Sequence, residues 1–334
     1  MKDLHIAVLG ATGAVGQEMI RILEESDIPG IDLIPLAGSS RPGRRISFRG
    51  SSLLVQSAEE QGFAGADYVL GATEAEISRA LAPVIREAGA VFIDNSSAFR
   101  MDASVPLVVP EINGEDAFRH QGIIANPNCS TIITLMAAAG IHRLSPIRTM
   151  VVSTYQAVSG AGSAGLRELE KELRQTLCGE EIIPQVFPAP IAMNVIAWIG
   201  SAAEGGYTDE ELKMQREGRR ILHDEALCVS CTCVRVPVAR SHSISVTLQT
   251  EEKLSLENVR HAIDSFPGCR LWEGNEGACP TPLDAAGQDA VLVGRLREAP
   301  ALENGLSLWC CGDQLRKGAA ANAVQILRLL TENS

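Results

Sequence analysis

Cys129 is the residue of this chain whose setting most clearly favours chemistry. It follows Asn126, Pro127 and Asn128 and opens an apolar stretch that runs to Gly140, so we expect it at the amino terminus of a helix. The N–H groups and dipole of a helix amino terminus stabilise a thiolate and lower the pKa of the thiol. Cys129 is therefore predicted to be a nucleophile.

The other eight cysteines lack this setting. Cys228, Cys231 and Cys233 form a C-x-x-C-x-C cluster, but no second ligand pair with zinc-like spacing follows. Cys231 and Cys233 also fall within strand-like sequence. We therefore predict no metal site.

His242 is the histidine best placed to serve such a nucleophile as an acid or base. It shares its parity on a predicted strand with Ile244, Val246 and Leu248, so it should point inward at the start of that strand. On position alone it is equally compatible with a structural core histidine. Both interpretations stay open at this point.

Arg235 lies on the preceding predicted strand, on the face opposite to Val234 and Val236. If the two strands form a hairpin through residues 239–241, its guanidinium and the imidazole of His242 line one cavity. A guanidinium can hold a carboxylate there by paired hydrogen bonds.

A glycine loop follows the first strand-like run. Gly10, Gly13 and Gly16 are spaced as Gly-x-x-Gly-x-x-Gly between residues 4–9 and a helical pattern that Pro29 ends. Missing side chains let backbone approach a pyrophosphate, and the helix amino terminus supplies donors. The loop predicts a dinucleotide cofactor, against the alternative of a tight but empty turn.

The end of the second strand bears on which cofactor binds. NAD-preferring sites usually carry an acid there, but residues 36–45 contain none, and offer two serines and three arginines. This composition suits a 2′-phosphate and favours NADP. The alternative is an ordinary basic surface loop.

Predicted strands and helices alternate around the glycine loop and must position it. Strands are predicted at residues 4–9, 31–37, 68–71 and 91–94 and a helix at 74–88. This order is typical of an α/β fold with a Rossmann-type, doubly wound parallel sheet covered on both faces.

From about Asn128 the pattern of predicted strands and helices changes. Strands at residues 148–155, 232–238 and 243–250 and helices at 165–177 and 208–222 predict a second, α+β domain. The apolar-striped helix at 316–330 is expected to return to the first domain.

Composition sets outer limits on function. The 334 residues favour two domains, and a net charge of −12 with 4% aromatic residues argues against a polyanion-binding or base-stacking surface. No apolar run approaches the roughly 20 residues of a membrane span, and no signal peptide is evident. An odd number of scattered cysteines does not suggest a disulfide framework. We expect a cytoplasmic protein that binds neither nucleic acid nor membrane.

Motifs along nearly the whole chain together resemble the bacterial aspartate-β-semialdehyde dehydrogenase family. They are residues 10–16, 94–100, 109–113, 126–131, 152–162, 235–238 with 242–243, and 316–320. The resemblance implies NADP-dependent, reversible conversion of L-aspartate 4-semialdehyde plus phosphate to 4-aspartyl phosphate. This step leads toward lysine, methionine and threonine, and by the lysine branch toward diaminopimelate. It also implies a homodimer, with residues 1–127 and 312–334 as the NADP-binding domain and 128–311 as the catalytic and dimerisation domain.

The resemblance also implies roles for single residues. Cys129 forms the acyl thioester, His242 transfers protons and Gln156 orients the substrate. The expected substrate contacts are Arg235 to the carboxylate, Glu210 to the amino group, and Arg100, Asn128 and Lys213 to the phosphate. The expected cofactor contacts are Gly10, Thr12, Gly13, Ala14, Val15, Gly16, Ser39, Ser40, Arg41, Thr73, Asn95, Ser159, Gly160 and Gln314.

Two departures from the family pattern stand out. The family often has Ser-x-Arg-Ser in the 2′-phosphate loop, whereas Arg41 here is offset by one place. Gln314 stands after Asp313 where the family usually has asparagine, so its amide contact on the nicotinamide side is expected to be longer or displaced.

Other functions remain possible from sequence. One is a related phosphorylating aldehyde dehydrogenase such as N-acetyl-γ-glutamyl-phosphate reductase, and another is a catalytically silent dinucleotide-binding paralogue. Taken singly, Arg100 and Gln156 are ordinary polar residues, and Glu210 with Lys213 is a common i,i+3 surface pair.

Overall fold

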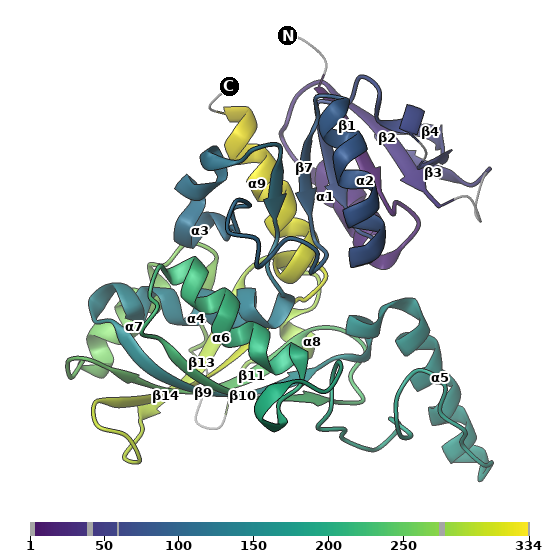
Figure 1. Cartoon of the computed structure of the whole chain (residues 1–334). Coiled ribbons are helices and arrows are strands. Elements are labelled where there is room, and N and C mark those ends of the chain that lie inside the picture. The colour runs from purple at the N-terminus through teal and green to yellow at the C-terminus, as the bar shows by residue number, and fades with distance from the viewer. Residues whose placement is uncertain (1–3, 39–42, 59, 274–277, 333–334) are drawn as a thin grey trace. The chain divides into compact units, whose positions relative to one another are not determined.

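The computed structural model describes residues 4–38, 43–58, 60–273 and 278–332 (Figure 1). The chain divides into two compact units, Met1–Asn128 with Ala319–Ser334, and Cys129–Gly318. The return to the first unit comes later than the expected 311/312 boundary. Gly318, the last residue of the second unit, packs on Cys129: a Cβ at residue 318 would lie 2.9 Å from that residue's Cβ.

The first unit contains the predicted doubly wound sheet. Among its described residues, six strands run in the order β5-β2-β1-β6-β7-β8, and all neighbours are parallel. The strands are β1 (Leu4–Leu9), β2 (Ile31–Ala37), β5 (Gln56–Ser57), β6 (Tyr68–Gly71), β7 (Val91–Asp94) and β8 (Ile123–Ala125). Ile6, Ala7 and Val8 are fully buried, as a strand covered on both faces requires.

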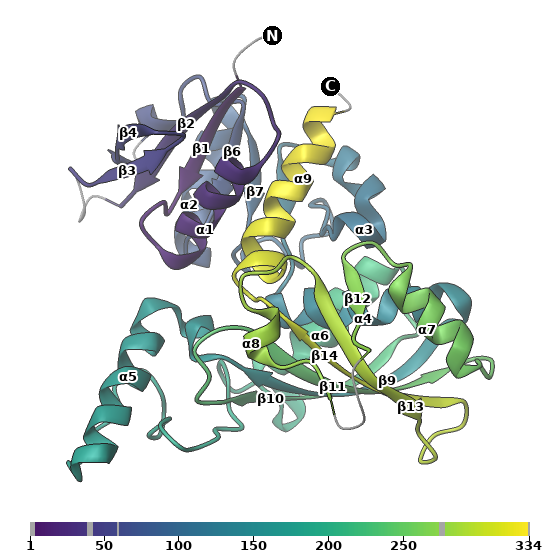
Figure 2. The same cartoon turned by 180° about the vertical axis from the view of Figure 1, so that it is seen from behind.

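Helices cover both faces of this sheet. Helix α2 (Ala75–Glu87) stands before the sheet in Figure 1, and α1 (Ala14–Glu25) and α9 (Ala321–Glu332) stand before it in Figure 2. Met19 and Leu23 of α1 and Val324 and Leu327 of α9 share one core with Ile6. The short helices are η1 (Glu60–Phe63), α3 (Pro110–Asn113) and η2 (Gly114–Arg119).

Two details differ from the expected elements. The C-terminal helix is not continuous: a π-helical turn at Arg316–Ala320 precedes α9. An unpredicted hairpin joins β3 (Arg45–Phe48) to β4 (Ser51–Leu54), and Arg45 Nε donates to Ser52 Oγ at 2.8 Å. One of the three arginines expected near a 2′-phosphate is thus held within this hairpin.

The second unit is the predicted α+β domain. Its described sheet has the order β10-β9-β11-β14-β13-β12. The strands are β9 (Ile147–Gln156), β10 (Cys228–Arg235), β11 (His242–Thr250), β12 (Cys269–Leu271), β13 (Val291–Glu298) and β14 (Gly305–Gly312). Helices α4 (Cys129–Leu144), α6 (Asp209–Leu222) and α7 (Leu256–Asp264) lie on one side of it (Figures 1 and 2). The other helices are η3 (Val158–Ala161), α5 (Gly162–Cys178), η4 (Glu204–Gly206) and α8 (Pro282–Ala285).

The hairpin between β10 and β11, which was given above as a condition, does not form. Strand β9 lies between them, parallel to β10 and antiparallel to β11. The connection crosses the end of β9 instead of forming a tight turn, since Val236 N–H donates to Gln156 O and Val238 O accepts from Val158 N–H. The ends of β9 and β10 and the start of β11 therefore meet at one edge of the sheet.

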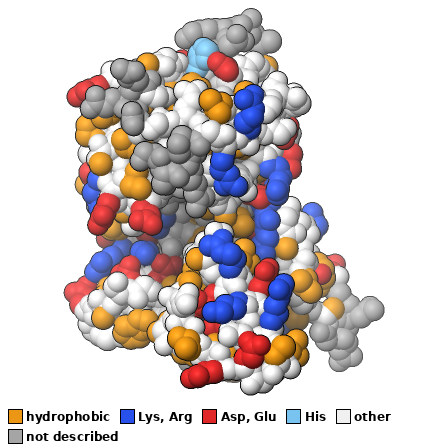
Figure 3. All heavy atoms as spheres, turned by 90° about the vertical axis from the view of Figure 1, so that its right-hand side faces the viewer, with side chains coloured by type: hydrophobic (Ala, Val, Ile, Leu, Met, Phe, Trp, Pro, Cys, Tyr) orange, Lys and Arg blue, Asp and Glu red, His pale blue; other side chains and the backbone are white. Residues whose placement is uncertain are grey.

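Acidic, basic and hydrophobic side chains are intermingled on the face of the molecule that Figure 3 shows. No helix within the described ranges is long and apolar enough to span a bilayer. Nor do the described His, Cys, Asp and Glu side chains form a group of three that could hold a metal ion.

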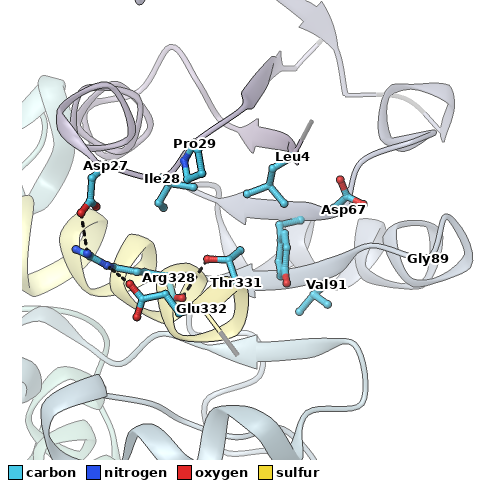
Figure 4. A pocket seen from close by; sticks show the side chains of 11 residues that line it. Leu4, Asp27, Ile28, Pro29, Asp67, Gly89, Val91, Arg328, Thr331 and Glu332 are labelled. Carbon is cyan, nitrogen blue, oxygen red and sulfur yellow. Dashed lines mark hydrogen bonds and ion pairs between the residues drawn. The ribbon is translucent and has the colours of Figure 1, made fainter. Parts of the chain in front are cut away.

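A cavity of about 490 Å³ lies at the amino edge of the sheet of the first unit (Figure 4). Leu4, Tyr68 and Val91 line it at the starts of their strands, and Arg328 pairs across it with Asp27. The glycine loop follows the opposite, carboxyl end of β1. None of the residues expected to act in catalysis or binding lines this cavity.

Candidate active site

Cys129 and His242 form the centre of the candidate site. Cys129 is the first residue of α4 and His242 the first of β11, and Cys129 Sγ lies 3.5 Å from His242 Nε2. The N–H of Ala157 donates to His242 Nδ1 at 3.1 Å. With Nδ1 accepting, the neutral ring carries its proton on Nε2 and presents it to the sulfur.

The His242 ring is completely buried. Burial is the main cause that lowers its pKa to about 3, and the charge of Arg235 lowers it further, while Glu210 and a backbone hydrogen bond with Ser241 oppose the change. The imidazole is therefore neutral near pH 7.

Arg235 and Gln156 lie side by side at the same sheet edge. They are the last residues of β10 and β9 and are paired in the parallel register, and both are buried. Arg235 Nη1 donates to Ala157 O at 2.7 Å, and its Cζ lies 5.9 Å from the centre of the Phe187 ring. Gln156 Nε2 donates to Thr154 Oγ1 at 3.3 Å.

Gly160 leaves space beside this group. A Cβ at residue 160 would lie 2.7 Å from Arg235 Nη1 and 3.5 Å from His242 Cε1. A side chain here would therefore press on both residues. The absence of one suits a small ligand that must reach the guanidinium and the imidazole together.

Glu210 and Lys213 lie on α6 and form an ion pair. Lys213 Nζ lies 2.9 Å from Glu210 Oε2 and 3.3 Å from Asp209 Oδ2. The charge of Glu210 also raises the pKa of Arg235 and of His242, although burial, the larger cause, lowers both pKa values. Glu210 thus belongs electrostatically to the Arg235 group, whereas the ammonium of Lys213 is held by two carboxylates.

Arg100 belongs to the first unit. It is 8% exposed, and its Nε and Nη2 donate to Asn126 O and Asn95 O at 2.9 and 2.7 Å. Asn128 is equally buried. These residues follow β7 and β8, so they gather at the carboxyl edge of the sheet. Their expected action on one phosphate together with Lys213, which lies in the second unit, stays a prediction.

The glycine loop is a tight turn in which two positions have no room for a side chain. Gly10 has φ +86°, and a Cβ there would lie 2.4 Å from Ala72 O. A Cβ on Gly16 would lie 2.2 Å from Gly10 O. Gly13 caps α1 without a side chain, so the N–H groups of Ala14 and its neighbours stay open to an anion.

The remaining predicted cofactor contacts have mixed positions. Thr12 and Val15 are partly buried in the glycine loop, Thr73 Oγ1 lies 3.2 Å from Ser78 Oγ, and Asn95 Nδ2 donates to Gly71 O at 2.8 Å. Gln314 Nε2 donates to Ser159 Oγ, within the second unit. Ser39, Ser40 and Arg41 lie outside the described residues.

Sequence reasoning assigned no role to Asp313. Its buried carboxylate accepts from Arg240 Nε and from Gly287 N–H, both at 2.6 Å, and from Leu315 N–H at 2.9 Å. The available signal was an acid directly after an apolar strand, with an arginine two places before His242. That signal gives no partner without the fold.

Comparison with known proteins decides the family. A model of the semialdehyde dehydrogenase NAD binding domain matches residues 5–120, and one of the semialdehyde dehydrogenase dimerisation domain matches residues 139–317. The chain belongs to the semialdehyde dehydrogenase family. The family expected from the sequence motifs is confirmed, and with it an oxidoreductase that acts on an aldehyde.

Relatives in this family match over nearly their whole length. The chain is 45% identical to the aspartate-semialdehyde dehydrogenase of Synechocystis and 42% identical to that of Bacillus subtilis, with 98% of each chain covered. A crystal structure of aspartate semialdehyde dehydrogenase II from Vibrio cholerae, complexed with ASA, has a TM-score of 0.96 at 40% identity, with 99% of both chains covered. These matches confirm the Rossmann-type fold with a second, mixed-sheet domain.

Proposed function

We propose that this chain catalyses the reversible, NADP-dependent oxidation of L-aspartate 4-semialdehyde with phosphate to 4-aspartyl phosphate. The observation that carries the proposal is the Cys129 thiol at a helix amino terminus, 3.5 Å from the imidazole of His242. The names of the relatives supply the substrate. Arg235 and Gln156 at one sheet edge, and Glu210 of α6, whose charge acts on Arg235, give the substrate's charged groups partners.

Cys129 starts the reaction in the oxidative direction. Its thiolate adds to the aldehyde carbon, forming a C–S bond and leaving the negative charge on oxygen. The Nε2–H of His242, aimed at the sulfur, stabilises the thiolate and then the developing oxyanion.

Oxidation and release follow on the same sulfur. When bound at the glycine loop, NADP would supply the hydride acceptor, and loss of hydride from the carbon attached to Cys129 Sγ would leave an acyl thioester on Cys129. A phosphate oxygen attacks the thioester carbonyl, the C–S bond breaks, and the thiolate returns. The proton lost from phosphate passes to solvent.

The substrate's fixed charges select the orientation. Arg235 suits the α-carboxylate, because a buried guanidinium gains most from a paired carboxylate. Glu210 suits the ammonium group. An N-acetylated substrate, as in the related N-acetyl-γ-glutamyl-phosphate reductase, has no ammonium for Glu210 to bind, so this carboxylate favours the aspartate substrate.

The cofactor proposal rests on the glycine loop. A Cβ on either Gly10 or Gly16 would collide with backbone, so the loop keeps the close approach that a dinucleotide needs. Preference for NADP over NAD rests on the absence of an acid at the end of β2 and on Arg44 nearby.

We also propose a homodimer formed through the second unit. Leu177, Ile183 and Met193 on and after α5 are exposed, Leu177 to 88%, in the unit that matches the dimerisation model. Sedimentation of the purified chain should give about twice 35.6 kDa. The nine free cysteines suit a reducing compartment such as the cytoplasm.

Initial rates test the proposed activity. The chain is assayed with aspartate semialdehyde and phosphate and with NADP or NAD, and then with N-acetyl-glutamate semialdehyde in place of the substrate. We expect phosphate-dependent NADPH formation with aspartate semialdehyde. Turnover of the N-acetylated substrate alone would replace the proposed activity with the reductase alternative, and no turnover of either substrate would favour a silent paralogue.

A further inference from the structure

The segment after β14 contacts Cys129 and the residue that precedes His242, all within the second unit. Gly318 packs against the Cβ of Cys129, and its N–H donates to Asp313 O at 3.0 Å. Four residues earlier, the side chain of Gln314 faces the residue before His242. One short segment thus contacts the nucleophile at one end and the approach to the imidazole at the other.

Gln314 is buried, and both ends of its amide are engaged inside this unit. Its Oε1 accepts from the N–H of Ser241 at 2.7 Å, and its Nε2 donates to Ser159 Oγ. A longer or displaced contact to nicotinamide was the expectation from sequence. In the structure the amide instead links the loop after β9 to the residue that precedes β11.

Ser241 has a backbone conformation that needs outside support. Its φ is +73°, in the left-handed region that non-glycine residues seldom adopt, and the residue is fully buried. Such conformations persist where the surroundings hold them. The hydrogen bond from Ser241 N–H to Gln314 is one such support, and the pair of Arg240 Nε with Asp313 Oδ2 at 2.6 Å is another.

His242 follows Ser241 directly, so the direction of its ring depends on this turn. The ring must satisfy two contacts at once, Ala157 N–H at Nδ1 and Cys129 Sγ at Nε2. A change of φ at Ser241 would swing the start of β11 and lengthen the contact to sulfur. We propose that Gln314 is a positioning residue that holds Ser241 in its left-handed conformation and thereby aims His242 at Cys129.

This inference rests on the proposed roles of Cys129 and His242. It predicts an effect of Gln314 on the thiol even when no cofactor is bound. A nicotinamide contact predicts the opposite pattern, a raised KM for NADP with unchanged chemistry at Cys129 in the cofactor-free protein.

The test measures alkylation of Cys129 by iodoacetamide against pH in the cofactor-free full chain, with the modified peptide quantified by mass spectrometry. Gln314→Met keeps the length of the side chain but loses both hydrogen bonds. Gln314→Glu keeps the bond from Ser241 N–H and replaces the other, because a carboxylate accepts from the Ser159 hydroxyl where the amide donates to it. It also adds a negative charge near His242. The matched control is Gln215→Met, which loses the bond from Val229 N–H to Gln215 Oε1 at the far end of β10 from Arg235.

We expect Gln314→Met to slow alkylation at pH 7 at least tenfold, because the thiolate loses its aligned donor. Its kcat should fall by a similar factor while the KM for NADP stays within threefold. Gln314→Glu should retain alkylation with its profile moved to higher pH, since an added negative charge opposes thiolate formation. Gln215→Met should leave the profile unchanged.

Two outcomes would overturn the inference. The first is a Gln314→Met profile that matches the wild-type profile. The second, which serves if that variant does not fold, is a Gln314→Ala profile that matches wild type, since alanine also lacks both hydrogen bonds. Alkylation of His242→Asn distinguishes failure of the positioning role from failure of the proposed function. An unchanged profile in His242→Asn contradicts the proposed Cys129–His242 pairing itself. A changed profile in His242→Asn together with an unchanged Gln314→Met profile contradicts only the positioning role of Gln314.

Discussion

At the scale of single residues, the buried His242 ring can act in two ways that substitution separates. It can donate Nε2–H to sulfur and oxygen, or it can also carry protons. Glutamine can place an amide N–H near the Nε2 position, whereas asparagine is too short to reach it.

We predict that His242→Asn lowers kcat by about 10² or more, because general acid–base groups contribute on that order. If donation alone matters, His242→Gln recovers much of the loss. If proton transfer matters, Gln and Asn fall equally. Steady-state rates from pH 6 to 9 measure both, and a near-wild-type rate for Asn would return His242 to the role of a structural core histidine.

Gly160 provides a second residue-scale prediction. A methyl group there would lie 2.7 Å from Arg235 Nη1, so Gly160→Ala should displace the guanidinium and raise the KM for the aldehyde about tenfold. Gly218→Ala in α6 is the control, since a Cβ there meets the side-chain ends of Leu227 at 3.3 Å and of Leu135 at 3.9 Å. Equal KM values for the two variants would contradict the placement of Arg235 in the substrate site.

At the scale of elements, the strand, glycine loop and helix act as one cofactor cradle. Gly16→Ala would place a Cβ 2.2 Å from Gly10 O, so the loop must open and the N–H groups of α1 must move. We predict at least a tenfold higher dissociation constant for NADPH, measured by fluorescence titration. Alkylation of Cys129 in the second unit should be unchanged, and an unaltered dissociation constant would contradict the cradle.

Elements also show what sequence could and could not predict. The parallel sheet followed from apolar runs alternating with helical periods, and the helix start at Cys129 followed from Asn-Pro-Asn and the apolar run after it. The false hairpin between β10 and β11 came from treating sequence neighbours as spatial neighbours. Nothing local reveals that β9 inserts between them, because strand order depends on long-range packing. The links of Gln314 and Asp313 were hidden for the same reason.

At the scale of the whole molecule, the lowered pKa of His242 makes folding stability depend on pH. In the unfolded chain the imidazole of His242 binds a proton below about pH 6.5, whereas in the folded chain it stays neutral down to about pH 3. Stability from this group is therefore complete above pH 6.5 and falls as pH drops, by about 1.4 kcal/mol per pH unit at most.

Chemical denaturation at pH 7, 6 and 5 tests this linkage. The wild-type free energy of unfolding should fall more steeply between pH 6 and 5 than that of His242→Gln, which has no group to titrate there. His120 and His142, whose pKa values burial also lowers, are present in both proteins and cancel in the comparison. Parallel slopes for the two proteins would contradict the neutral, buried imidazole.

The proposed covalent chemistry is tested most directly by a single-turnover experiment without phosphate. The chain is mixed with aspartate semialdehyde and NADP, and NADPH and the intact mass are followed together. We predict a burst of one NADPH per subunit and an acyl group on the peptide that contains Cys129, which phosphate then removes. No burst, or an acyl group on another residue, would contradict the thioester at Cys129.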